Sequence, residues 1–367
     1  MTMRNFYLFL ICFVGFISPA FAKAPSAEEI NQRGFGTIFT PHMFVMEWSQ
    51  DHGWHNARIQ DYKPFSFDPA SLHMHYAQTI FEGIKAFRMT SGECALFRPR
   101  DHLKRMNSSA RIMSMPEIDV DEVLIYLKAL VSLDADWVPG LKGTSLYIRP
   151  SMIATEATLN LKASEKYTFF ILLSPVGSFY QNGFNTVPIF VCDQYTRASF
   201  GGVGEAKTGG NYGAGLRAQK LAKKEGCAQV LWLDPQERTY VEEVGTMNIF
   251  FVIDDEVVTP ALSGSILAGI TRKSILALGN KWGLNMSERK ISIDEVIKAV
   301  QEGRLTEAFG TGTAAAIAPI GKLKYKGVVY TINDNQVGPI TQSLYDALCG
   351  IQYGTEQDED GWLELIE

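Results

Sequence analysis

The sequence predicts a two-domain protein of mixed α/β (α+β) class, in which a small α/β domain precedes a larger, antiparallel barrel-like domain with helices. The 367 residues are 46% hydrophobic, which is enough for a substantial core and more chain than most single domains contain. A stretch rich in β-formers over 167–173 ends at Ser174-Pro-Val-Gly177, where we place the boundary. Beyond it, short strands joined by tight turns indicate a meander.

The small domain is predicted over residues 23–175 and is followed by a linker over 176–186. Apolar and polar residues alternate over 62–87, and Asp101 fits the N-cap of a helix that continues to about Met113. A second helix is expected over 121–133. Strands are then expected over 146–148 and 167–173, where β-forming residues are enriched.

The large domain is predicted over residues 187–367 and opens with a strand over 187–192. A glycine-rich loop carrying Lys207 leads into a helix over about 213–224, which Gly226 would close. Strands over 230–233, 240–243 and 249–253 are joined by turns at Asp234-Pro235 and Asp254-Asp255. Helices begin near Thr271 and Ile293, and a strand over 305–309 leads into Gly310-Thr-Gly-Thr313.

Charge and cysteine usage exclude several classes of partner. The net charge is −6 with a pI near 5.6, so the chain has no basic footprint for nucleic acid. The five cysteines are scattered, without a Cys-x-x-Cys pair or the spacing of metal ligands. His73 and His75 alternate as zinc ligands on a strand would, but they lack companion ligands nearby. We therefore predict no metal.

Residues 1–22 have the pattern of a signal peptide. Arg4 precedes an apolar run over 6–17 that is short for a membrane span, and Ala20-Phe-Ala22 is a small-x-small cleavage site. Cleavage after Ala22 predicts export, to the periplasm or beyond the cell. The alternative is a misassigned start: translation from Val14 would remove the leader and leave a cytoplasmic protein. Both interpretations stay open.

Two short motifs predict a pyridoxal phosphate site. Lys207-Thr-Gly-Gly-Asn-Tyr212 is followed by Glu243-Val-Gly-Thr-Met-Asn248. A lysine among glycines can form a Schiff base with an aldehyde, a tyrosine can bond the phenolate oxygen, and a carboxylate can keep the pyridine nitrogen protonated. Each element alone is more often an ordinary loop residue, so the prediction rests on their combination.

Two further segments could hold a phosphate. Leu267-Ala-Gly-Ile-Thr271-Arg272 places small residues at an expected helix start, where free N–H groups and the helix dipole attract anions. Gly310-Thr-Gly-Thr313 is a second turn of small residues. Gly201-Gly-Val-Gly204 does not predict a dinucleotide site, because the strand, helix and downstream acid of that motif are not suitably arranged.

With these motifs, the chain resembles the branched-chain amino acid aminotransferases of pyridoxal-phosphate fold type IV over about residues 35–354. The shared markers, in order, are Phe35-Gly36, Phe39-Thr-Pro-His-Met43, Phe81-Glu-Gly-Ile-Lys-Ala-Phe87, Leu96-Phe-Arg-Pro99, Tyr147-Ile-Arg-Pro150, Gly201-Gly-Val-Gly204, Lys207-x-x-Gly-Asn-Tyr212, Glu243-Val-Gly-Thr-Met-Asn248 and Phe309-Gly-Thr-Gly-Thr313. The resemblance implies a homodimer with pyridoxal 5'-phosphate between the small and large domains of each subunit.

The resemblance also implies roles for individual residues, with Lys207 as the catalytic Schiff-base lysine. The other cofactor-binding residues would be Arg105, Arg197, Tyr212, Glu243, Leu267, Ile270, Thr271 and Thr313. The substrate pocket would comprise Phe35, Tyr76, Phe81, Tyr147, Arg149, Thr246 and Ala314, with Leu159 reaching in from the partner subunit. Mammalian relatives carry a redox-active Cys-x-x-Cys where this chain has Ala315 and Ala318, so no thiol switch is expected there.

The implied activity is transfer of the amino group of L-leucine, L-isoleucine or L-valine to 2-oxoglutarate by ping-pong kinetics. The products would be branched 2-oxo acids and L-glutamate. One alternative is another fold type IV activity, D-amino acid transamination or aminodeoxychorismate lyase chemistry, against which the block over 81–87 argues. A catalytically idle exported binding protein is a second alternative, and it would not need Lys207, Tyr212 and Glu243 together.

Overall fold

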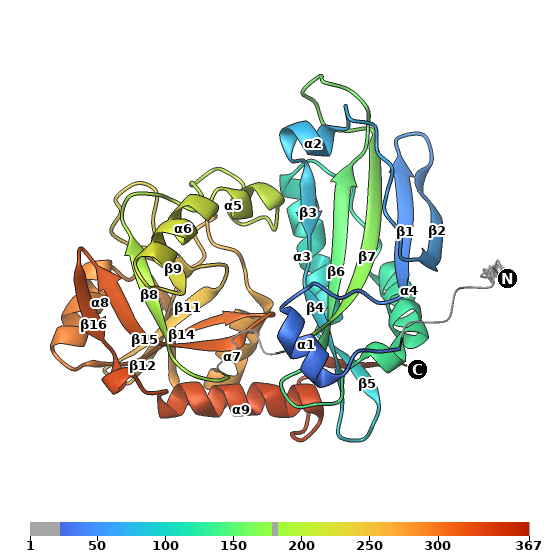
Figure 1. Ribbon diagram of the computed structural model, residues 1–367. Helices are drawn as coiled ribbons and strands as arrows, with labels where there is room; N and C mark the ends of the chain where they lie inside the picture. Colours follow the sequence, from blue (N-terminus) through green and yellow to red (C-terminus); the bar gives the residue numbers. More distant parts are fainter. Residues whose placement is uncertain (1–22, 178–182, 367) are drawn as a thin grey trace, which may run out of the picture.

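The computed structural model describes residues 23–177 and 183–366. The predicted leader over 1–22 lies outside the described residues, as does part of the predicted linker over 176–186. Two sheets with helices packed on them lie next to one another, the first on the right and the second on the left of Figure 1. The predicted mixed class is confirmed. No helix within the described residues has the length and apolarity needed to cross a membrane.

The first sheet is antiparallel and combines N-terminal strands with one strand from the end of the described chain. Its order is β17-β5-β4-β6-β7-β1-β2, and β3 pairs with β6. The strands are β1 His42–Ser49, β2 Gly53–Asp61, β3 Thr79–Phe81, β4 Ile84–Arg88, β5 Cys94–Phe97, β6 Ser145–Ala154, β7 Lys166–Val176 and β17 Leu363–Ile366. The expected strands over 146–148 and 167–173 therefore lie within β6 and β7, which are longer than predicted.

Two long helices pack against this sheet and build its core. Leu103 and Met106 of α3 and Leu127 of α4 are buried in one cluster with Phe44 and Ile84 from the strands. The helices of this half are α1 Ala27–Arg33, α2 Leu72–Tyr76, α3 Pro99–Ile112, α4 Val120–Leu133 and the 3-10 turn Ala135–Trp137. These contacts bury one face of each helix, which is the main source of stability for helices of this length.

One predicted helix start is wrong. Asp101 is not the N-cap of α3, because Arg98 caps the helix in a left-handed conformation and Pro99 occupies its first turn. Proline suits that position because its fixed φ is helical and its missing N–H has no partner there anyway. The next helix, α4, begins one residue before the predicted start, and the Asp119 side chain accepts from the Asp121 and Glu122 N–H groups.

The second sheet is mixed and curls into the barrel-like body. Its order is β10-β9-β8-β15-β14-β11-β12-β13, and β16 pairs with β15. The strands are β8 Val187–Cys192, β9 Gln229–Leu233, β10 Val241–Val244, β11 Asn248–Ile253, β12 Glu256–Pro260, β13 Asn285–Arg289, β14 Leu305–Gly312, β15 Ala316–Tyr325 and β16 Val328–Thr331. The turns at Asp234 and Asp254 make antiparallel pairs as expected, whereas β8–β9, β8–β15 and β12–β13 are parallel.

The helices of the second half lie around this sheet. They are α5 Gly209–Gly213, α6 Leu216–Lys224, α7 Ile270–Lys281, α8 Ile293–Gln301, α9 Pro339–Tyr353 and the 3-10 turn Asn333–Asn335. The helix predicted over 213–224 corresponds to α6, which begins at Leu216, and the short helix α5 forms within the stretch that was predicted as a glycine-rich loop. Gly226 follows α6 with a φ of +74°, as predicted for a glycine that closes a helix.

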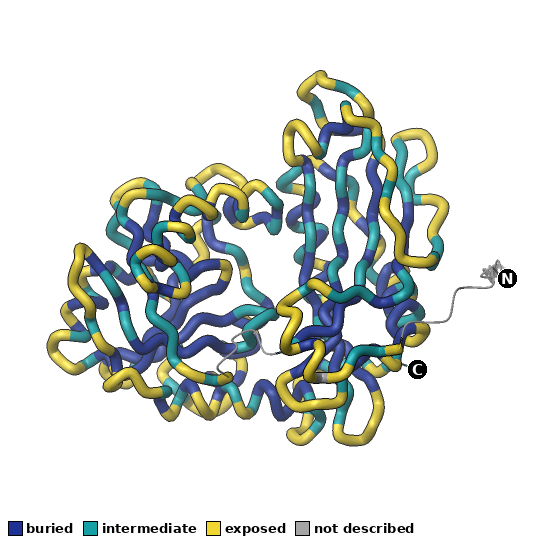
Figure 2. Tube along the Cα trace, viewed as in Figure 1, coloured by how far each residue is buried: buried dark blue, intermediate teal, exposed yellow. Residues whose placement is uncertain are grey.

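A shared apolar cluster joins the two halves. Phe87 and Phe97 from the first sheet are buried with Phe309 of the second and Leu344 of α9. In Figure 1, α9 runs beneath the second sheet and its end reaches the first, and Figure 2 shows buried stretches in strands of both halves. Because the cluster includes Trp362, the segment before β17 ties the second half to the first.

Candidate active site

A cavity of about 230 Å³ is lined by residues from both halves of the molecule. Fourteen of the predicted site residues line it: Phe35, Phe81, Arg105, Tyr147, Arg149, Lys207, Tyr212, Glu243, Thr246, Leu267, Ile270, Thr271, Thr313 and Ala314. The folded chain thus brings together motifs that are far apart in the sequence. Within the described residues, the lining of this cavity does not include Arg197, Tyr76 or Leu159.

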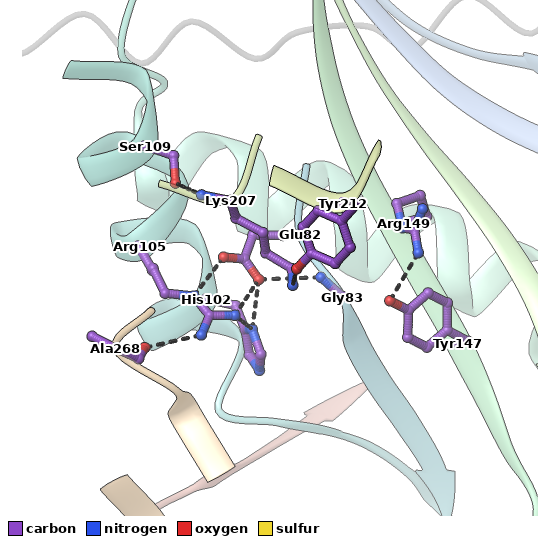
Figure 3. Close-up of polar contacts among 10 residues, drawn as sticks. All are labelled: Glu82, Gly83, His102, Arg105, Ser109, Tyr147, Arg149, Lys207, Tyr212 and Ala268. Carbon is purple, nitrogen blue, oxygen red and sulfur yellow. Dashed lines mark hydrogen bonds and ion pairs between the residues drawn. The ribbon is translucent and has the colours of Figure 1, made fainter. Parts of the chain in front are cut away.

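Lys207 is fixed at the cavity by backbone contacts with the first half. Its carbonyl accepts from the N–H of Phe81 (3.0 Å), and its N–H donates to Ser109 Oγ (2.9 Å). The Nζ donates to Tyr212 Oη over 2.8 Å (Figure 3). Burial, reinforced by the charge of Arg105, lowers the pKa of Lys207 to about 8. The amine is therefore more available as a nucleophile or base than an exposed lysine.

The short helix α5 turns the chain after Lys207, so the Tyr212 side chain lies next to the Lys207 side chain. Burial, together with the negative charge of Glu243, raises the pKa of Tyr212 to about 12. The phenol consequently keeps its proton at neutral pH. It can donate that proton in a hydrogen bond to an anionic oxygen beside Lys207.

Glu243 projects from β10 and is 3% exposed. Its Oε2 lies 2.9 Å from Arg197 Nε, and its Oε1 accepts from the N–H of Leu267 over 2.8 Å. Burial raises the pKa of Glu243, and the charge of Arg197 opposes that rise. Arg197 thus acts on the site through Glu243 rather than from the cavity wall.

An anion could be held on the side of the cavity where α7 begins. Gly269 is the N-cap of α7 and, because it lacks a side chain, makes no capping hydrogen bond to this helix start. The first N–H groups, at Ile270 and Thr271, therefore lie free at the cavity with the positive end of the helix dipole. Gly269 is required here, because a Cβ would overlap the side-chain amide of Asn248. Arg105 faces the same region and donates from Nη1 to the Ala268 carbonyl over 3.0 Å.

The opposite wall is aromatic and carries one cation. The ring centre of Phe81 is 4.9 Å from Lys207 Nζ and 4.7 Å from the Arg149 guanidinium. Arg149 donates to Tyr147 Oη over 3.1 Å, and Phe35 meets the Tyr147 ring edge-on at 4.8 Å. Arg149 Nε is buried and has no hydrogen-bond partner within the described residues, so it has donor capacity for a ligand.

Two predicted residues lie together but away from the cavity. Tyr76 donates from its hydroxyl to the Leu159 carbonyl over 2.7 Å. Their exposed fractions are 41% and 64%. Within the single described chain they form a surface rather than part of the cavity wall.

Sequence reasoning missed three polar residues in the block over 81–102. Glu82 is fully buried and accepts hydrogen bonds from Arg105 and His102. Lys85 is half-buried and donates from Nζ to the Ala314 carbonyl over 2.9 Å. The available signal was charge: both Glu82 and Lys85 interrupt an otherwise apolar strand segment, which is unusual without a partner.

The donors fit a small aromatic aldehyde that carries a phosphate. The cavity offers a nucleophilic amine, a protonated phenol, a buried carboxylate and, at the start of α7, a cradle for an anion. Such a set can bind an electron-withdrawing ring and move a proton beside it.

Comparison with known proteins agrees with this chemistry. The family model for amino-transferase class IV matches residues 79–323. The branched-chain-amino-acid aminotransferase 2 of Bacillus subtilis is 52% identical over 340 residues, which cover 93% of each chain.

Solved structures show the same fold. The Escherichia coli branched-chain amino acid aminotransferase has a TM-score of 0.75 at 24% identity, covering 88% of this chain and 99% of that one. The branched-chain amino acid aminotransferase of Thermobaculum terrenum, solved in its PLP form, has a TM-score of 0.73 at 24% identity, covering 88% and 98%. At this identity the likeness establishes the fold alone.

Proposed function

Because the chain belongs to the class IV aminotransferase family, we propose that it is a branched-chain-amino-acid aminotransferase that uses pyridoxal 5'-phosphate. It transfers the amino group of L-leucine, L-isoleucine or L-valine to 2-oxoglutarate. The relative from Bacillus subtilis, 52% identical over nearly the whole chain, supports this assignment. The observation that carries it is the 2.8 Å contact of Lys207 Nζ with Tyr212 in a cavity that Glu243 also lines.

The cofactor-binding residues differ in charge, and each charge matches a different part of the cofactor. Arg105 and the N–H groups of Ile270 and Thr271 would hold the phosphate, and the turn at Thr313 would complete the phosphate site. Glu243 would stabilise positive charge on the ring nitrogen, and Tyr212 would donate to the phenolate oxygen. Pyridoxal phosphate, when bound to Lys207, supplies an electron-withdrawing ring that stabilises negative charge at the substrate α-carbon.

Lys207 also moves the proton in the reaction. The pKa of Lys207, about 8, gives its Nζ a neutral fraction that would take the proton from the substrate α-carbon. Tyr212 Oη lies 2.8 Å from Lys207 Nζ and restricts the positions that the amine can take. Glu243 acts through its charge rather than as a proton carrier, because both of its oxygens already have partners.

The aromatic wall explains how one pocket serves two kinds of substrate. Phe35, Phe81 and Tyr147 remove the branched side chain of leucine, isoleucine or valine from water. Arg149, with its unused Nε, binds the distal carboxylate of glutamate or 2-oxoglutarate. Ping-pong kinetics follow because both amino acids use the same site in turn.

The proposal is tested by purifying the protein and recording its visible absorption before and after adding amino donors. A band from lysine-bound cofactor that disappears with L-leucine, together with glutamate formation from 2-oxoglutarate, is the expected result. Turnover of D-alanine without turnover of L-leucine would instead assign the D-amino acid activity. A colourless protein that binds no pyridoxal phosphate would refute the enzymatic assignment.

We further propose that the active protein is a homodimer. Met74, Tyr76, Leu159 and Leu161 have exposed apolar side chains, Tyr76 contacts Leu159, and a second copy would cover this part of the chain. In that arrangement Leu159 enters the partner's pocket. Light scattering should give twice the mass of the chain, and Leu159→Asp should produce a monomer with reduced activity. A monomeric, fully active wild-type protein would refute this part.

A further inference from the structure

A buried acid lies directly behind the arginine of the phosphate cradle. Glu82, between β3 and β4, has 0% exposure. Its Oε1 accepts from Arg105 Nε over 2.7 Å and its Oε2 from Arg105 Nη2 over 2.8 Å, which is a two-pronged contact (Figure 3). His102, one turn earlier on α3, contacts Oε2 over 2.9 Å.

The carboxylate of Glu82 is saturated with donors. Its Oε2 also accepts from the N–H of Gly83 over 3.1 Å. Burial alone would raise the pKa of Glu82, but the charge and hydrogen bonds of Arg105 and His102 outweigh burial and hold the pKa well below its usual range. Glu82 is therefore an anion at any physiological pH, and His102 must donate to it from a protonated Nδ1.

These contacts fix the plane of the Arg105 guanidinium. Nε and Nη2 are held by Glu82, and Nη1 is held by the Ala268 carbonyl at 3.0 Å. An arginine has five N–H donors, so one N–H on Nη1 and one on Nη2 are left for a ligand. Because three atoms of the group are anchored, those two donors have a defined direction.

We propose that Glu82 is a positioning residue that orients Arg105 toward the phosphate subsite, with His102 supporting Glu82. The inference rests on the proposed function, because the phosphate is that of pyridoxal phosphate. A carboxylate beside an anion site is unfavourable by charge alone. Its benefit must be geometric: it keeps a long, flexible side chain in the one orientation that meets the phosphate.

Glu82→Gln separates geometry from charge. The amide keeps the shape of the side chain, but its NH₂ must face either Arg105 Nε or the pair formed by Arg105 Nη2 and His102 Nδ1, all of which are donors. One of the two hydrogen bonds between residue 82 and Arg105 is therefore lost, and the guanidinium turns away from its position. Removal of the negative charge acts in the opposite direction and would strengthen anion binding.

The readout is the affinity of cofactor-free protein for pyridoxal 5'-phosphate and for pyridoxal, which lacks the phosphate. Both aldehydes are titrated by the absorption that develops on attachment to Lys207. We expect Glu82→Gln to weaken pyridoxal phosphate binding by about 10- to 100-fold, the range for a lost hydrogen bond to a charged group, and pyridoxal binding by less than about twofold. A change confined to the phosphate-bearing ligand distinguishes positioning from general damage to the pocket.

Two further sets of variants serve as controls. Glu307→Gln alters another buried carboxylate, which accepts from the N–H groups of Ile340 and Thr341 at the start of α9 and does not line the cavity. It should lower thermal stability and leave the ratio of the two affinities unchanged. His102→Asn can still present an N–H to Glu82 and should retain most of the phosphate preference, whereas His102→Leu should lose much of it.

The outcomes separate cleanly. A wild-type protein that binds neither aldehyde would refute the proposed function and the inference with it. Another outcome is that the wild-type protein binds pyridoxal phosphate more tightly than pyridoxal and that Glu82→Gln increases this difference in affinity. This result would show that Glu82 only reduces the effective positive charge of Arg105. Equal loss of both aldehydes, or unchanged binding of both, in Glu82→Gln would also overturn the positioning role, and identical behaviour of the two His102 variants would refute the support from His102.

Discussion

Lys207 should react as an amine with a pKa of about 8, which gives covalent labelling by an aldehyde a defined pH dependence. Burial is the main cause of the lowered pKa, and the positive charge of Arg105 adds to it. At pH 7 the neutral, nucleophilic fraction is about 300-fold larger than for a lysine of ordinary pKa. The labelling rate should therefore rise with pH and level off above about pH 8 to 9.

The assay uses pyridoxal, borohydride trapping and peptide mapping of cofactor-free protein at a series of pH values. Lys85 makes the experiment selective, because burial also lowers its pKa to about 8. Its Nζ donates to the Ala314 carbonyl, and it does not line the cavity within the described residues. Because the two lysines have similar pKa values, access to the cavity decides which one reacts, and the label should fall on Lys207.

A matched pair of variants completes this test. Lys207→Arg should abolish specific labelling, whereas Lys85→Met should leave the rate at Lys207 and its pH profile nearly unchanged. A rate that is still climbing at pH 10 would show that burial does not shift the pKa of Lys207. A label on Lys85 would refute the assignment of the Schiff-base lysine itself.

Three other substitutions give independent predictions. Glu243→Gln should retain bound cofactor but lose at least about 100-fold in kcat, about 2.7 kcal/mol of barrier, because an amide cannot stabilise charge on the ring nitrogen; near-normal turnover would contradict this. Gly83→Ala places a Cβ against the Tyr147 hydroxyl and should cost about 1 to 3 kcal/mol in urea unfolding while raising KM; an unchanged KM would show that Tyr147 can move freely. Trp362→Ala removes the ring packed on Phe97 and should cost about 3 to 5 kcal/mol of unfolding free energy, whereas a loss below about 1 kcal/mol would mean that the C-terminal segment adds little.

Local sequence signals predicted the elements whose limits are set locally. The strand over 187–192 is found as predicted, because β-branched and aromatic residues fill it and the chain on either side breaks the pattern. The start of α3 was missed although Pro99 marks it, because Asp101 offered a more familiar capping residue. Helix α5 was predicted as a loop because three of its five residues are glycine.

Features that depend on distant pairing could not be read from the sequence. The contact between Glu82 and Arg105 requires β3 and α3 to be placed first, and the sequence shows only an acid in an apolar block. The Arg197 contact with Glu243 is similar, since each residue alone resembles an ordinary surface charge. Strand β17 is only four residues long, so its pairing with β5 has no local signature.

Because β17 pairs with β5, the first sheet can be completed only after β17 has been synthesised. While the ribosome is still translating the second half, the nascent first sheet has an open edge at β5 and an uncovered Phe97. An open strand edge next to exposed apolar surface is where chains associate wrongly, and chaperones bind such surface. The vulnerable interval therefore lasts until Trp362 and β17 leave the exit tunnel, so slow translation of the second half should increase chaperone dependence more than slow translation of the first.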